Sequence, residues 1–134
     1  MTGWFYQNEE LTTPPEDMDS FVYLITRLRD GKAYVGKKTF WNKRRRPPLK
    51  GKKRVRVDYV ESDWKSYYGS SDALNADVAL EGEEAFTREI LHLCKLRGAA
   101  SYLEAKEQFA RDVLTGNYYN GIIAVKISRS NLRL

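Results

Sequence analysis

The hydrophobic and polar positions of the chain predict a β-hairpin and a third strand. Residues 21–27 are a β-branched and aromatic run that is typical of a strand. Residues 29–32, with the sequence Arg-Asp-Gly-Lys, are a turn signal, and residues 33–37 are predicted to return as the second strand. Residues 86–93 predict another strand after a turn at Gly82.

Helical spacing of apolar residues is clearest between residues 98 and 114, and Gly116 is expected to end this helix. A shorter helix is predicted over residues 72–80, after a polar loop that supplies an N-cap. Residues 122–127 are apolar enough to be expected as a final strand.

This order of elements predicts an α+β fold in which helices flank a small, mainly antiparallel, three-stranded sheet. At 134 residues the chain has room for one domain with one core. We expect residues 1–20 to form an N-terminal extension, a short strand or cap that packs on this core. Residues 21–134 are then a single domain that contains a basic insert, residues 37–56.

The charge pattern changes the picture most. The net charge is +5, but residues 37–56 hold eleven basic side chains and no acidic one, while the rest of the chain holds 12 basic and 18 acidic ones. Such a block attracts a polyanion through phosphate neutralisation and counterion release, although a solvated basic loop is the ordinary alternative. The predicted nucleic-acid contacts are Lys38, Lys43, Arg45, Arg46, Lys50, Lys52, Lys53, Arg54 and Arg56.

The two prolines of the insert, Pro47 and Pro48, leave room for short helices only, and residues 55–60 alternate weakly enough to be extended. Apolar runs elsewhere are far shorter than the roughly 20 residues that cross a bilayer. Residues 7–19 are polar and acidic and lack a signal pattern. We therefore expect a cytoplasmic protein without membrane contact.

The chain has one cysteine, Cys94, and one histidine, His92. This count excludes an intramolecular disulfide, a thiolate zinc cluster, histidine-based metal sites and most Ser-His or Cys-His catalytic pairs. Both residues lie in an apolar strand and are expected to be structural. Any metal ion must be held by oxygen ligands, which favours Mg²⁺ or Mn²⁺.

The hairpin carries two short motifs. Residues 21–23 are Phe-Val-Tyr, and residues 34–36 are Tyr-Val-Gly. With Tyr23 and Tyr34 in these places, the pair resembles the signature of the GIY-YIG nuclease superfamily, except that Phe21 replaces the leading glycine. The resemblance implies the GIY-YIG fold and cleavage of DNA.

Further residues follow at the spacing of that family. Lys37 and Arg44 lie three and ten residues after Tyr34. Residues 68–71 and 86–91 are similar to elements of phage-type, Seg-like homing endonucleases, and Glu104 and Asn120 fit the later glutamate and asparagine of the family. The resemblance spans about residues 20–122.

The resemblance implies a metal-dependent endonuclease that hydrolyses phosphodiester bonds of double-stranded DNA. Glu104 would hold Mg²⁺ or Mn²⁺, and Arg44 would grip the scissile phosphate in a bidentate fork. Tyr34, with a pKa lowered beside Lys37, would orient or deprotonate the water, with Tyr23 hydrogen-bonding nearby. Asn120 would position backbone or substrate.

Alternatives stay open at several positions. Glu107 can replace Glu104, which lies opposite the apolar stripe on a helical wheel, where a solvated glutamate is the ordinary interpretation. Arg45 or Arg46 can replace Arg44, because the prolines interrupt the expected helix. Asn117 can replace Asn120.

The whole chain also has rival interpretations. It can be a catalytically inactive DNA-binding protein with the nuclease fold, or an interaction protein whose basic loop binds an acidic partner. Specificity for a target would come from the basic insert, a homodimer or a partner protein. A phage-encoded nuclease would act in the cytoplasm of the host cell.

Overall fold

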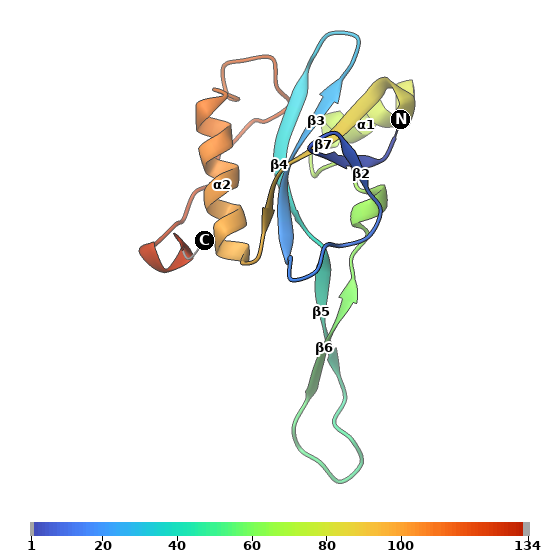
Figure 1. The fold of residues 1–134 in the computed structure, drawn as a ribbon, viewed down its shortest axis with the longest axis vertical. Coiled ribbons are helices and arrows are strands. Elements are labelled where there is room, and N and C mark those ends of the chain that lie inside the picture. Colours follow the sequence, from blue (N-terminus) through green and yellow to red (C-terminus); the bar gives the residue numbers. More distant parts are fainter. Residues whose placement is uncertain (1, 133–134) are drawn as a thin grey trace.

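The computed structural model describes residues 2–132 of the chain, which form an α+β fold around a mixed five-stranded sheet (Figure 1). The strand order in this sheet is β2-β1-β7-β3-β4, so β4 is an edge strand. The strands are β1 (Trp4–Tyr6), β2 (Glu9–Leu11), β3 (Ser20–Arg27), β4 (Ala33–Thr39) and β7 (Phe86–Cys94).

The predicted hairpin is confirmed. β3 and β4 pair antiparallel, and Tyr23 lies opposite Gly36. The turn between them uses Gly31 at φ 76°, a left-handed conformation that glycine adopts without steric cost. β7 pairs antiparallel with β3 and fills the centre of the sheet, as the run of residues 86–93 predicts.

The prediction of a three-stranded sheet is wrong, because the N-terminal segment contributes two more strands. β1 pairs parallel with β7, and β2 pairs antiparallel with β1. Trp4 explains why this segment docks: its indole is buried at 1% exposure and donates a hydrogen bond to the Trp64 carbonyl, 2.6 Å away. Burial of so large a side chain favours pairing of the short strands.

The predicted final strand over residues 122–127 is also wrong. Residues 121–128 are irregular, and Ile122 is 73% exposed. The edge of β4 that such a strand would need is already taken. The backbone groups of Ala33 bond Asn117 and Tyr119, and the side chain of Asn120 bonds Val35.

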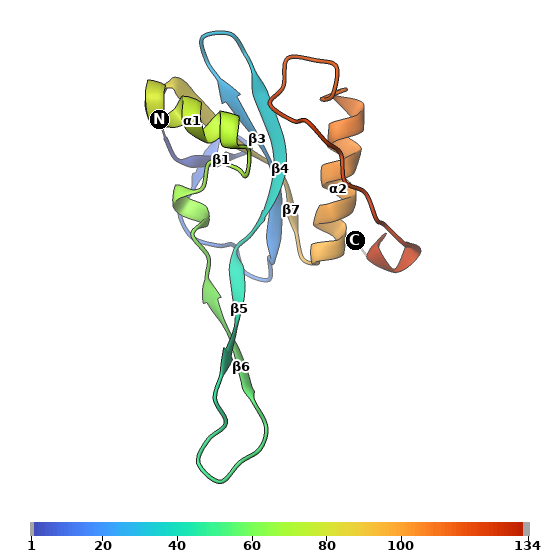
Figure 2. The same ribbon diagram turned by 180° about the vertical axis from the view of Figure 1, so that it is seen from behind.

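Two helices cover opposite faces of the sheet (Figures 1 and 2). α1 (Asp72–Glu81) agrees with the predicted short helix, and the Ser71 hydroxyl caps it by accepting from the Leu74 amide. α2 (Arg97–Ala110) ends four residues before the predicted end at residue 114, because the chain turns at Asp112, whose φ is 55°. A short 3₁₀ helix, η1 (Trp64–Ser66), lies on the same side as α1, and η2 (Glu83–Ala85) and η3 (Arg129–Leu132) complete the elements.

The core is therefore in two parts. The larger part is aromatic, and includes Phe21, which is fully buried and packs against Trp4, Phe40 and Trp64 with ring centroids 4.8–6.2 Å apart. The smaller part lies under α2 and is made of small and aliphatic side chains: Val22, Val35, Cys94, Ala99, Ala100 and Val113.

Most of the basic insert belongs to a separate two-stranded ribbon. Residues 41–61 contain no short helix, and the second strand of the ribbon confirms the extended run expected over residues 55–60. β5 (Trp41–Arg46) pairs antiparallel with β6 (Arg56–Glu61), and the ribbon projects away from the rest of the molecule (Figure 1). We call residues 41–61 the arm. The two prolines lie in its terminal loop, where they exclude a helix and do not interrupt the strand pairing. No helix in the described residues is long and apolar enough to cross a membrane.

Candidate active site at the sheet edge

A pocket of about 350 Å³ lies at the β4 edge of the sheet. Tyr34 and Glu104 reach it from opposite faces, since Tyr34 packs with the aromatic core and Glu104 belongs to α2. Ser70, before α1, and Asn120, after α2, contribute further polar groups to its lining. An edge strand makes this meeting possible, because an inner strand would separate the two faces.

Tyr34, which lines the pocket, belongs to a group of three packed tyrosines. The ring of Tyr23 lies 6.2 Å from that of Tyr34 and 6.1 Å from that of Tyr67, measured between centroids. Gly36 allows this packing, because a β-carbon there would lie 2.6 Å from Tyr23 Cζ and 2.9 Å from Tyr34 Cε2. The glycine of the second motif therefore serves close approach of two rings and not an unusual backbone angle.

The expectation of a lowered pKa at Tyr34 is wrong. Burial raises the pKa of the Tyr34 phenol, and the hydrogen bond with the Ser70 hydroxyl, 2.8 Å from it, opposes this only in part. Burial also raises the pKa of Tyr23 well above its ordinary value. Lys37 does not lower the Tyr34 pKa because its ammonium lies on the other face of β4, where it donates to the Ser101 hydroxyl at 2.6 Å.

Glu104 is half-buried and faces the pocket, contrary to the solvated position that a helical wheel predicts. Burial raises the pKa of its carboxyl, and the Lys37 ammonium partly offsets this. Within residues 2–132 its carboxylate accepts no hydrogen bond from the protein. It is thus available to a ligand.

The alternative glutamate already forms bonds with other side chains of the protein. Glu107 lies 2.7 Å from His92 Nε2 through one carboxylate oxygen, and it accepts from Arg111 Nε at 3.1 Å through the other. Burial pushes the pKa of Glu107 up, but the bonds to His92 and Arg111 outweigh it and the pKa is lowered. The geometry favours Glu104 as the pocket residue and gives His92 a structural partner.

Asn120 is fixed to the sheet edge. Its Oδ1 accepts from the Val35 amide at 3.0 Å, and its Nδ2 donates to the Val35 carbonyl at 2.9 Å. Gln108 Nε2 donates to the same carbonyl at 3.1 Å. Asn117, the alternative, is exposed and donates to the Asp30 carbonyl in the turn before β4.

The structure does not bring Arg44 to this pocket. Arg44 lies on β5 of the arm and binds Asp58 through two hydrogen bonds of 3.0 and 2.9 Å. Its alternatives Arg45 and Arg46 lie on the same strand. Lys38 is separate again, since its ammonium lies 2.6 Å from Asp63 and 4.2 Å from the centre of the Tyr67 ring.

Comparison with known families matches residues 4–123 to the family described as "Putative endonuclease segE, GIY-YIG domain". The chain belongs to this SegE-type GIY-YIG family. The matched segment runs from β1 to just after Asn120. It includes the arm and every pocket-lining residue up to Ile122. No curated protein matches the chain, and no solved structure does.

GIY-YIG nucleases generally use divalent metal ions. No group of three or more His, Cys, Asp or Glu side chains gathers anywhere in the described residues. A protein cage for a metal ion is therefore not found in this part of the chain. Mg²⁺ needs no such cage, because it commonly binds one or two carboxylates and keeps water and substrate phosphate as its other ligands. The unbonded carboxylate of Glu104 in a polar pocket fits that pattern.

Sequence reasoning missed one feature of this SegE-type site, a polar stripe on α2. Arg97, Ser101, Glu104 and Gln108 recur at intervals of four, three and four, which places them on one side of the helix. Three of them form hydrogen bonds with β4 or with the start of β5. Arg97 donates to the Trp41 carbonyl, Ser101 accepts from Lys37, and Gln108 donates to the Val35 carbonyl. A second, polar periodicity beside the apolar one was the available signal.

Proposed function

We propose that this SegE-type protein is a metal-dependent endonuclease that hydrolyses phosphodiester bonds of double-stranded DNA. The observation that carries the proposal is the convergence of Tyr34, Ser70 and Glu104 on one pocket at the sheet edge, where the Glu104 carboxylate accepts no hydrogen bond from any described residue. Hydrolysis of a phosphodiester needs an oriented water, charge neutralisation at the phosphoryl group and help for the leaving oxygen.

Glu104 would hold Mg²⁺ or Mn²⁺ through its carboxylate. The bound ion would supply charge neutralisation at the phosphoryl oxygens and assist the leaving group. Lys37 lies on the same side of the sheet as α2 and donates to Ser101, one turn before Glu104. We assign to its ammonium the grip on the scissile phosphate, since Arg44 lies on the arm.

Tyr34 would orient the attacking water through its hydroxyl. Because burial raises the pKa of Tyr34, this phenol is protonated at neutral pH and acts first as a hydrogen-bonding group. The Ser70 hydroxyl fixes its direction at 2.8 Å. Tyr23 supports the Tyr34 ring from the core, and Asn120 holds the backbone between Tyr34 and Gly36.

The arm would hold DNA outside the pocket. Its cations include the predicted contacts Lys43, Arg45, Arg46, Lys50, Lys52, Lys53, Arg54 and Arg56, and Arg44 joins them there. Lys38 lies at the root of the arm, beside Asp63. A concentration of positive charge of this kind favours binding through release of counterions from the phosphate backbone.

The proposal is tested with supercoiled plasmid and Mg²⁺ or Mn²⁺. The wild type should nick or linearise the plasmid, and Glu104→Gln should not, because the amide cannot serve as an anionic ligand. Glu107→Gln removes the other candidate carboxylate, and Glu83→Gln is a matched change at an exposed position. Cleavage by Glu104→Gln at the wild-type rate, or loss of cleavage only in Glu107→Gln, would reject the assignment.

A homing role in phage is the finer form of this proposal. It would place the protein in the cytoplasm of the host cell and requires selective cutting. A wild type that cuts long phage DNA at few sites supports it, whereas uniform degradation argues against it. Sedimentation of the protein with and without DNA tests whether a homodimer forms.

The alternative function is DNA binding without cleavage. Phe21 in place of the first motif glycine favours it, because this ring fills the core between Trp4 and Phe40. It predicts salt-dependent DNA affinity that Glu104→Gln leaves unchanged, and no cleavage under any metal condition. Any metal-dependent cutting by the wild type that Glu104→Gln abolishes excludes it.

A further inference from the structure

The arm is a ribbon with solvent on both faces. It carries nine of the chain's 23 basic residues between positions 43 and 56, while its acidic side chains are Asp58 and Glu61. Figure 1 shows it extending from the body of the molecule, away from both helices. An isolated two-stranded hairpin is only marginally stable in water. The arm therefore needs contacts that hold it to the rest of the protein, and its projection from the body needs a functional explanation.

The anchor is at the root of the arm. Glu61 accepts a hydrogen bond from the indole of the buried Trp64 at 2.9 Å. Ser62 donates through its hydroxyl to the Thr39 carbonyl at 2.6 Å and through its amide to the Phe40 carbonyl at 2.8 Å. The ribbon is thus held at the end of β4, in continuity with the strand that carries Tyr34.

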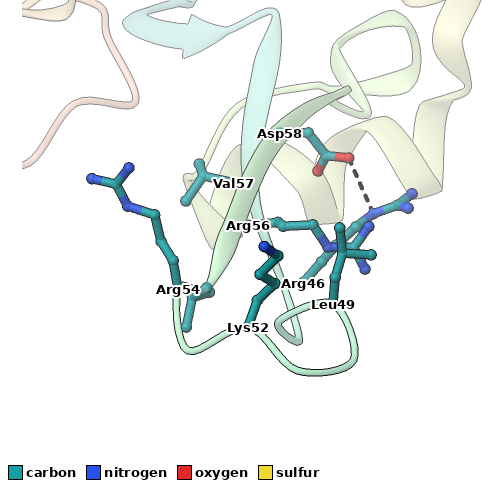
Figure 3. Close-up of a pocket in the computed structure, with 8 residues that line it drawn as sticks. Arg46, Leu49, Lys52, Arg54, Arg56, Val57 and Asp58 are labelled. Atoms are coloured by element: carbon teal, nitrogen blue, oxygen red, sulfur yellow. Dashed lines mark ion pairs between the residues drawn. The ribbon is translucent and has the colours of Figure 1, made fainter.

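Residues paired across the ribbon share a face, and the two faces differ. On the first face, Arg44 pairs with Asp58 and Arg46 with Arg56. Asp58 binds Arg44 and also lies 3.1 Å from Arg46 Nε, the ion pair that Figure 3 shows. This face is therefore partly neutralised and cross-linked. Its ion pairs stiffen the ribbon where no core can do so.

The second face, which we call the reading face, is made of Lys43 opposite Tyr59 and Arg45 opposite Val57. Among residues 2–132, neither cation forms an ion pair. Tyr59 is 60% exposed and Val57 is 48% exposed. Exposed apolar side chains grouped beside solvated cations are typical of a contact surface.

The end of the arm is hollowed. A cavity of about 690 Å³ lies between the strand ends and the loop (Figure 3). Its charged lining is Arg46, Lys52, Arg54 and Arg56 against Asp58 alone, and Leu49, Val55 and Val57 supply the apolar part. Four cations against one carboxylate suit a polyanion backbone and not an acidic metal site.

From these features we propose that the arm enters the major groove of duplex DNA as a two-stranded ribbon. The reading face contacts base edges, with Lys43 and Arg45 donating to them and with Val57 and Tyr59 lying against thymine methyl groups. The cations at the end of the arm hold the phosphates beside the groove. This inference rests on the proposed function in that it takes DNA as the substrate.

Groove dimensions decide between the two grooves. The major groove of B-form DNA is about 12 Å wide and admits a two-stranded ribbon, whereas the minor groove is about 6 Å wide. In A-form RNA the major groove is too deep and narrow for side chains to read. The arm should therefore recognise duplex DNA in preference to duplex RNA.

The test measures binding in EDTA, where no cleavage occurs, to a labelled mixed-sequence DNA duplex over a series of salt concentrations. The full chain is compared with Lys43→Ala/Arg45→Ala, with Val57→Ala/Tyr59→Ala and with the control Lys106→Ala/Lys126→Ala. The control removes the same charge from exposed positions outside the arm. Circular dichroism verifies that each variant folds.

The cation pair should weaken binding about tenfold or more at low salt with little change in the salt slope, because its side chains contact base edges and not phosphates. The apolar pair should weaken binding without changing the slope, and the control should do neither. Methyl green, a major-groove ligand, should compete, whereas netropsin, a minor-groove ligand, should not. An RNA duplex should bind weakly and without dependence on the reading face.

Equal losses in the arm and control variants, or competition by netropsin alone, would overturn the groove proposal. These outcomes are separate from the nuclease proposal. A wild type that binds through the arm but never cuts rejects the enzyme and keeps the ribbon. A wild type that cuts plasmid while the arm variants bind as tightly as it does rejects the ribbon and keeps the enzyme.

Discussion

Asn120 completes the open edge of the sheet by bonding both backbone groups of Val35. The amide of Val35 donates to Asn120 Oδ1 at 3.0 Å, and the Val35 carbonyl accepts from Asn120 Nδ2 at 2.9 Å. The Asn120 side chain thus forms the two hydrogen bonds to the Val35 backbone that a neighbouring strand would otherwise form. Because Tyr34 and Gly36 flank Val35, this pair also fixes the backbone that presents the pocket tyrosine.

Asn120→Ala should lower the free energy of unfolding by about 1–3 kcal/mol, the usual cost of a buried polar group left unpaired. The Val35 amide would lose its partner, whereas the carbonyl would keep Gln108. Urea unfolding measures the change. Asn117→Ala is the matched control, since its bond to the Asp30 carbonyl is exposed, and it should stay within about 0.5 kcal/mol. Equal effects would contradict the assignment.

Gly36→Ala should destabilise the protein by about 1–3 kcal/mol, the typical cost of an extra methyl group in a packed core. The new β-carbon would lie 2.6 Å from Tyr23 Cζ and 2.9 Å from Tyr34 Cε2, so both rings must move. Thermal and urea unfolding test this. Gly121→Ala adds the same methyl where no atom lies within 4 Å and should change the unfolding free energy little. A Gly36→Ala variant as stable as the wild type would show that the rings relax freely.

Local signals predicted the central elements correctly. The turn before Ala33, the Ser71 cap and the apolar spacing of α2 act over a few residues, and each gave the right element. Residues 1–20 were expected to pack on the core as a short strand or cap, but their pairing into the sheet was missed because it depends on a distant contact. Trp4 is buried against Phe21 and donates to Trp64, sixty residues away.

Only the second strand of the arm was predicted, as the extended residues 55–60, and β5 was missed because its sequence carries almost no apolar alternation. Ion pairs between Arg44, Arg46 and Asp58, and an anchor at Glu61, take the place of burial. Such pairing depends on register, which charge composition does not encode. Phe21 stands where the family motif has a glycine. The fold accommodates its ring there because other aromatic side chains pack around it.

The site was predicted as a set of residue types and not as a geometry. Resemblance selected Tyr34 and Glu104, and these two do line one pocket. A helical wheel alone placed Glu104 in solvent, since it cannot represent a sheet edge that lets two faces meet. The pKa of Tyr34 is raised and not lowered as expected. The Lys37 ammonium lies across β4 from the phenol and therefore does not offset the effect of burial.

Acid should weaken the link between the hairpin turn and α1. The Arg27 guanidinium lowers the pKa of Asp30 to about 2, and Arg27 also binds Asp77 and Glu81 of α1. Because the folded-state pKa is depressed, the stabilisation is complete above about pH 4 and is lost as pH falls towards about 2. Asp30→Asn should lower stability at neutral pH and flatten this acid loss, as measured by urea unfolding against pH.

Asp17→Asn is the control for that titration, since Asp17 is exposed and its positive φ of 64° suits asparagine. It makes the same chemical change without touching Arg27. Its stability should follow the wild type across the acid range. A parallel loss in both variants would indicate a general effect of net charge and not the Arg27 pair.

Glu104→Gln should make the metal-free protein more stable at neutral pH. Burial raises the pKa of Glu104, so the folded state binds this proton more tightly than the unfolded chain does. Stability therefore falls as pH rises through the raised pKa, and the carboxylate is a cost at neutral pH that an amide avoids. Urea unfolding in EDTA should show the gain at neutral pH and its disappearance in acid. Glu107→Gln, which breaks bonds to His92 and Arg111, should instead lose stability. A loss in Glu104→Gln at neutral pH would mean that its carboxylate is already satisfied by the protein.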